Sequence, residues 1–190
     1  MSSEPSYKSL FDSAMKLISG CISLDGKPLS RPGFFERRRL NNGLELLRQA
    51  AEIEPEYGAA SLIAAKVEER LGRSEERLKW LRRAAITAPG NTIVAIELGG
   101  ALSQLGHHAE AVSVLSAAAT VSPEDPRIQS NLGVALLLAG SVADSISAFE
   151  RLQALEPGHR VNERLLMLAQ KVCAGHQAKP NSEAELIASL

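Results

Sequence analysis

Four prolines recur at a constant step of 34 residues, and this period constrains the fold more than any other feature. Three glycines keep the same step. The two sets are Pro55, Pro89, Pro123 and Pro157, and Gly72, Gly106 and Gly140. Such a period is typical of arrays in which each helical hairpin buries its apolar face against its neighbours. We therefore expect an all-α solenoid of stacked hairpins rather than a single globular core.

Apolar residues keep the same period, which predicts a buried stripe on each helix. Two columns consist of Leu47, Leu81, Leu115 and Phe149, and of Leu44, Leu78, Val112 and Ile146. Small residues at Ala65, Gly99 and Gly133 would let two helix backbones approach closely. The periodic glycines suit a left-handed position after the first helix of each unit. The prolines would end the second helix.

The stretches 95–123 and 129–157 resemble tetratricopeptide repeats, through the Leu-Gly pair, the glycine between the helices, the small residue early in the second helix and the closing proline. Residues 58–91 resemble a weaker copy, and 34–57 supply only a second helix. The resemblance implies a right-handed α-solenoid over 34–159, divided into 34–57, 58–91, 92–125 and 126–159. Arg77 and Glu68 depart from the pattern, because the equivalent positions hold small residues and leucines.

The two flanks lie outside the repeat. Residues 1–33 are expected to hold an amphipathic helix at 8–22 and a loop at about 23–33, since 27–33 contains two prolines. Residues 160–174 are predicted to form a capping helix. The tail, 175–190, is expected to be mobile unless its apolar end, with Leu186, Ile187 and Leu190, docks on the repeats.

Composition narrows the function classes. The net charge is −1, so no overall electrostatic field attracts nucleic acid. Aromatic residues make up only 4% of the chain. Two cysteines do not make a disulfide scaffold. The start lacks a secretory signal pattern, and no apolar run approaches the ~20 residues of a membrane span. We expect a cytoplasmic protein without a membrane span.

No motif assembles a reaction centre, so we expect no enzyme, no catalytic residue, no metal site and no cofactor. His107 and His108 are adjacent in an expected turn, where they would not converge on one ion. The run Arg37–Arg39 is the best nucleic-acid candidate, but a solvated helix face is the preferred interpretation. Trp80 is either a core residue or an exposed anchor.

The resemblance implies that the first helices line a concave groove for a partner protein. Carried onto this chain, the groove residues are Leu62, Ile63, Lys66, Arg70, Ile93, Ile96, Gly100, Arg127, Asn131, Val134, Leu137 and Leu138. A clamp for a peptide's terminal carboxylate is not expected, because only Lys66, Arg127 and Asn131 suit it. The stripe favours an apolar peptide or amphipathic helix. The tail, the N-terminal helix or a second copy could cover the same stripe instead.

Three functions remain open at this point. The first is an adaptor or assembly factor that binds a protein through the apolar groove, with a homodimer possible. The second is a dedicated chaperone for a secreted or assembled subunit, since the layout is similar to class II chaperones of type III secretion. The third is a regulatory subunit tethered to an enzyme or nucleic acid through Arg37–Arg39. Nucleic acid is not the expected partner.

Overall fold

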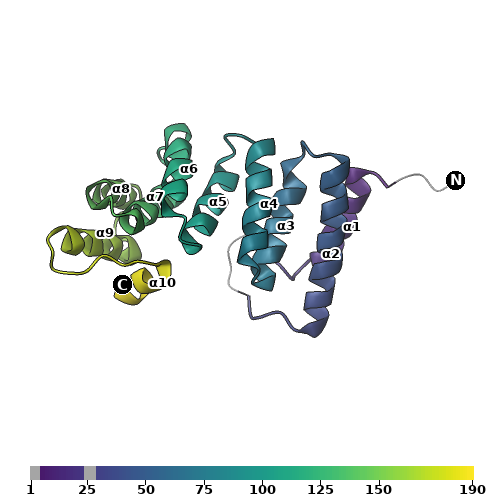
Figure 1. Cartoon of the computed structure of the whole chain (residues 1–190), viewed down its shortest axis with the longest axis horizontal. Coiled ribbons are helices and arrows are strands. Elements are labelled where there is room, and N and C mark those ends of the chain that lie inside the picture. The colour runs from purple at the N-terminus through teal and green to yellow at the C-terminus, as the bar shows by residue number, and fades with distance from the viewer. Residues whose placement is uncertain (1–4, 24–28) are drawn as a thin grey trace. The chain divides into compact units, whose positions relative to one another are not determined.

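The computed structural model describes residues 5–23 and 29–190, and ten α-helices account for most of them (Figure 1). No strand occurs among these residues. The helices pair in chain order, which confirms the predicted all-α fold of consecutive hairpins. The chain divides into two compact units, residues 1–89 and 90–190.

The first unit contains four helices. These are α1 (Tyr7–Ile18), α2 (Phe34–Ile53), α3 (Gly58–Leu71) and α4 (Ser74–Thr87). Each packs against the next. Their core includes Ile18, Leu40, Leu47 and Ala64, all with no exposed surface. The N-terminal helix therefore takes the place of the missing first helix beside α2.

The predicted helix at 8–22 is shorter than expected. It ends at Ile18, because Gly20 adopts a left-handed conformation with φ of 73° and turns the chain. Cys21 lies beyond this turn, yet it is buried in the core of the unit. Of the predicted loop at 23–33, residues 24–28 lie outside the described residues.

The second unit contains six helices. These are α5 (Thr92–Gln104), α6 (His108–Val121), α7 (Pro126–Ala139), α8 (Val142–Leu155), α9 (Arg160–Cys173) and α10 (Glu183–Ser189). Helices α5 to α9 pack in sequence, and α5 also packs directly against α7. The period explains this arrangement, since each hairpin buries the column residues Leu115 or Phe149 completely.

Two helical glycines allow the close approach inside these hairpins. A Cβ atom at Gly99 would lie 2.5 Å from Leu115 Cγ, and one at Gly133 would lie 2.4 Å from Phe149 Cε1. Both distances are shorter than van der Waals contact, so a side chain there would push the second helix away. The glycine of the Leu-Gly pair thus leaves room for the large side chain that the next helix packs against it.

The two residues that depart from the repeat are buried, and each pairs with a more exposed residue of opposite charge. Arg77 is 7% exposed, and its Nη2 lies 3.1 Å from Glu69 Oε1. Glu68 is 4% exposed, and its Oε2 lies 3.4 Å from Arg73 Nη1. Burial raises the pKa of Glu68 despite the opposing contacts from Arg73 and Trp80. The hairpin stays closed around the two charged side chains because each of them pairs with a residue of opposite charge, Arg77 with Glu69 and Glu68 with Arg73.

The tail is folded against the second unit. Its helix α10 places Leu186, which is 4% exposed, in the core cluster of α7, α8 and α9. Lys179 Nζ donates a hydrogen bond of 2.9 Å to the carbonyl oxygen of Leu138 near the end of α7. Of the tail's apolar residues, Leu186 and Leu190 pack on this cluster, whereas Ile187 is 69% exposed.

Candidate functional site

The predicted groove residues of the first unit lie on α3, and several are engaged within the unit. Ile63 packs against the core. Arg70 Nε donates to the carbonyl oxygen of Cys21 at 2.9 Å, and its Nη2 donates to Glu36 Oε1 at 3.2 Å. Lys66 Nζ lies 3.4 Å from Glu69 Oε2. Arg70 therefore holds the segment after α1 and the start of α2 together.

In the second unit the structure brings six predicted residues onto two neighbouring helices. Helix α5 carries Ile93, Ile96 and Gly100, and α7 carries Arg127, Asn131 and Val134. We call these six residues the α5–α7 face. The helices pack directly against each other. Ile93 and Arg127, like Gly100 and Val134, occupy equivalent repeat positions 34 residues apart, so they point to the same side.

The α5–α7 face is open and largely apolar. Ile93 is 50% exposed, and Ile96, Gly100 and Val134 are half-buried. A Cβ atom at Gly100 would meet no atom within 4 Å, so there is space beside the helix at this point. Apolar side chains around an open position suit an apolar partner segment.

Arg127 supplies the positive charge of this face, and it is held in place by Asp125. Its backbone N–H donates to Asp125 Oδ1 at 2.9 Å, and its Nη2 donates to Oδ2 at 2.7 Å. The hydrogen bond from Arg127 lowers the pKa of Asp125. The pKa of Arg127 is raised, chiefly by Asp125 and in smaller part by the charge of Glu97 on α5. This last effect places the two helices within electrostatic reach.

A hollow of about 320 Å³ adjoins the face where α7 begins. Arg127, Ser130 and Asn131 line it from α7, and Val161 and Asn162 line it from α9. Asn162 is 5% exposed and donates to Glu156 Oε2 at 3.0 Å. Sequence reasoning missed the α9 residues. The period was the available signal, since Val161 stands 34 residues after Arg127.

Two predicted groove residues lie in the core instead. Leu137 has no exposed surface, and Leu138 is 3% exposed. Both belong to the cluster that includes Leu165 and Leu186. The terminal helices therefore cover the second half of the α7 stripe, and the open part is the half that carries Arg127, Asn131 and Val134. Internal cover, one of the two alternatives left open by the sequence, applies to Leu137 and Leu138.

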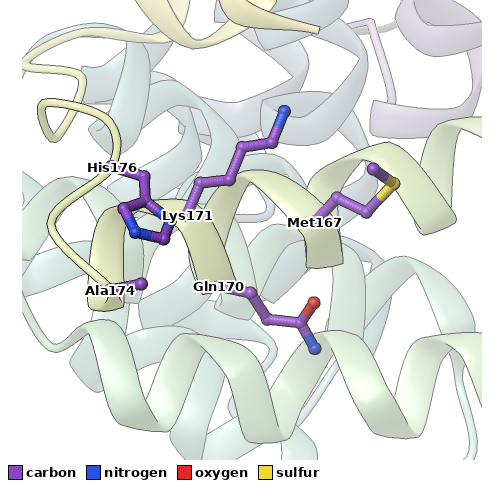
Figure 2. A pocket seen from close by; sticks show the side chains of 5 residues that line it. All are labelled: Met167, Gln170, Lys171, Ala174 and His176. Atoms are coloured by element: carbon purple, nitrogen blue, oxygen red, sulfur yellow. The ribbon is translucent and has the colours of Figure 1, made fainter.

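A second hollow lies along α9 and the turn after it, with a volume of about 290 Å³ (Figure 2). Met167, Gln170, Lys171, Ala174 and His176 line it. In Figure 2 the Lys171 and Gln170 side chains extend in different directions rather than toward a common point. This arrangement offers an uneven surface, not a set of groups that converge on one reacting atom.

Other sequence candidates occupy structural positions. Arg39 Nε and Nη2 donate to the carbonyl oxygens of Leu17 and Ser19, at 2.9 and 3.1 Å, and so cap the end of α1. Trp80 is half-buried against the core of the first unit. Among residues 5–23 and 29–190, no group of three His, Cys, Asp or Glu side chains is placed to hold a metal.

Within the same residues, no helix has the length and apolar content needed to cross a bilayer.

Comparison with known proteins places the repeats in a family. A tetratricopeptide repeat family model matches residues 33–92 and 96–159. No curated protein matches the sequence.

Solved structures share the fold at low sequence identity. A crystal structure of MamA is 12% identical, with a TM-score of 0.72, over 94% of this chain and 87% of that one. MamA 41-end from Desulfovibrio magneticus RS-1 is 15% identical, with a TM-score of 0.71, over 95% and 93%. YrrB, a TPR protein with an unusual peptide-binding site, is 19% identical, with a TM-score of 0.66, over 75% and 73%.

Proposed function

Because the chain belongs to the tetratricopeptide repeat family, we propose that it is a protein-interaction module, an adaptor or assembly factor, whose α5–α7 face binds a partner. The partner segment is an apolar peptide or an amphipathic helix. One observation carries this proposal. The face combines exposed Ile93 with open space at Gly100 and adjoins a hollow beside Arg127.

The chemistry of the face suggests how such a segment binds. Apolar side chains of the partner would cover Ile93, Ile96 and Val134, which removes apolar surface from water. Asn131 would accept and donate hydrogen bonds at the hollow, and Arg127, whose guanidinium is paired with Asp125, would donate its remaining N–H groups there. The peptide-binding site of YrrB, which has the same fold, supports this mode. We expect micromolar binding, on the order of −8 kcal/mol.

We also propose that the protein is cytoplasmic. The proposal rests on the cysteine count, because two cysteines do not make a disulfide scaffold and a chain of this kind suits a reducing compartment.

Affinity capture from the native cell, quantified by mass spectrometry, tests the site. The bait is the full chain, and the blocking variant is Gly100→Trp, because a Cβ atom at this position would meet no atom within 4 Å. Ile93→Glu is a second blocking variant. The matched control is Ser116→Trp, on an exposed position of α6 in the same unit.

We expect both blocking variants to lose the captured partners while Ser116→Trp retains them. Circular dichroism checks that all three variants keep their helical content. If Gly100→Trp and Ile93→Glu capture the same partners in the same amounts as the unmodified chain, the α5–α7 face is not the binding site.

A further inference from the structure

Two adjacent aromatic side chains are almost fully exposed at the start of α2. Phe34 is 76% exposed and Phe35 is 78% exposed. Their ring centroids lie 5.6 Å apart with an interplanar angle of 80°, so the rings pack edge to face against each other. Leu29, a few residues earlier, is 43% exposed. The contact between the two rings joins them into one exposed apolar patch, and such patches mark interaction sites.

The pair projects from the unit rather than lining a groove. Helix α2 has 20 residues, whereas α1 has 12 and α3 has 14. Figure 1 shows the first turns of α2 extending beyond the end of α1. The buried side of α2 is marked by Leu40 and Leu47. At about 100° per residue, Phe34 and Arg38 fall on the opposite side of the helix.

Exposed arginines flank the two phenylalanines in the sequence. Arg31 and Arg38 are exposed. Arg37 is also exposed, and only its Nε is engaged, as a donor to the carbonyl oxygen of Pro32 at 3.2 Å. Arg39, by contrast, is turned toward the end of α1.

Several acidic groups at this end of the unit are engaged with other cations. Glu36 accepts from Arg70 at 3.2 Å, and its second oxygen accepts from the backbone N–H of Gly33 at 3.2 Å. Glu76 pairs with Lys79 at 2.6 Å. These carboxylates therefore do not neutralise Arg31 and Arg38. Residues 31–38 thus carry two exposed aromatic rings and three exposed arginines.

We propose that this aromatic tip, comprising Leu29, Arg31, Phe34, Phe35, Arg37 and Arg38, binds the surface of a membrane that contains anionic phospholipids. The two rings enter the boundary between headgroups and acyl chains, and the arginines contact the phosphates. Basic residues beside an anionic leaflet and aromatic side chains at its interface are the two components of peripheral binding. The tip lies in the first unit, so this inference does not depend on the α5–α7 face.

The convex shape favours a bilayer over a peptide or a nucleic acid. Peptide segments bind in grooves or along open edges, whereas a projecting pair of rings can enter a soft, planar surface. Single-stranded nucleic acid stacks on open ring faces. Here Phe34 and Phe35 pack against each other, which covers part of that surface.

Vesicle flotation with the full chain tests the proposal. One set of vesicles is phosphatidylcholine alone, and the other is phosphatidylcholine mixed with phosphatidylglycerol. We expect the chain to float with the anionic vesicles about tenfold more than with the neutral ones, and to be released by high salt. The double variant Phe34→Ser/Phe35→Ser should lose about tenfold in binding, and Arg31→Glu/Arg38→Glu should lose the dependence on anionic lipid.

Two controls separate the tip from general surface effects. Ile86→Ser removes another exposed apolar side chain, 81% exposed on α4, and Arg160→Glu reverses an exposed charge on α9. Both should float like the unmodified chain. All variants change exposed positions, and circular dichroism checks whether they remain folded. A Phe35→Trp variant should show a blue-shifted emission on anionic vesicles if the ring is inserted.

The proposal is wrong if the unmodified chain does not float with anionic vesicles at physiological salt. It is also wrong if the double phenylalanine variant floats as well as the unmodified chain. A third result, in which that variant loses a captured protein or RNA while vesicle binding is absent throughout, would assign the tip to that partner and overturn the membrane assignment.

Discussion

Gly99 and Gly100 are adjacent in α5, but their surroundings differ. A Cβ atom at Gly99 would overlap Leu115, whereas one at Gly100 would meet nothing within 4 Å. We expect Gly99→Ala to lower the free energy of unfolding by about 1–3 kcal/mol through overpacking. Gly100→Ala should raise it by roughly 0.5–1 kcal/mol, because alanine favours the helix. Urea denaturation measures both, and equal losses would contradict the packing of α5 on α6.

Glu68 gives the chain a pH-dependent contribution to stability. Burial raises its pKa above the value of 4.5 typical of a free glutamate, so the folded state binds the proton more tightly than the unfolded state does. The contribution of Glu68 is therefore favourable below pH 4.5 and is lost as the pH rises through the raised pKa.

Replacing Glu68 with leucine, the residue found at the equivalent positions 102 and 136, should remove this loss. We expect Glu68→Leu to raise the free energy of unfolding by about 1 kcal/mol at pH 7. The gain should shrink when the protein is unfolded below pH 4.5. A less stable leucine variant at pH 7 would show that the contacts of Glu68 with Arg73 and Trp80 outweigh the cost of its burial.

At the scale of single elements, the short helix α10 depends on one side chain for its docking. Leu186 is 4% exposed and Ile187, its neighbour, is 69% exposed. We expect Leu186→Ala to speed hydrogen exchange of the α10 amides, because the helix loses its anchor and opens locally. Ile187→Ala is the matched control and should leave exchange unchanged. Equal effects of the two variants would show that α10 does not dock through Leu186.

The helices of the repeat were predictable from the sequence. Which repeat residues the flanking segments bury was not predictable. Columns such as Leu115 and Phe149 encode contacts inside and between repeats, since each position recurs in the same surroundings. Leu138 also belongs to a recurring face. The tail that covers Leu138 is not part of a repeat, so no set of equivalent positions predicts where the tail packs. The exposed pair Phe34 and Phe35 has no counterpart one period later either, because Glu68 and Glu69 stand there.

At the scale of the whole molecule, the two proposed surfaces lie in different units and should act separately. Gly100→Trp should abolish capture of the protein partner and leave flotation with anionic vesicles unchanged. Phe34→Ser/Phe35→Ser should have the opposite effects. The same purified variants serve both assays, and a variant that loses both activities would indicate misfolding or a single shared site. Together the two surfaces would make the chain a device that recruits a protein to a membrane.

The burial of Cys21 and the exposure of Cys173 give the folded chain one reactive thiol without any engineering. A maleimide dye added under native conditions should attach to Cys173 at the end of α9, roughly 18 Å along the helix axis from Val161. Binding beside Val161 would then be visible as a change in dye anisotropy. Labelling of the buried Cys21 would report transient opening of the first unit's core.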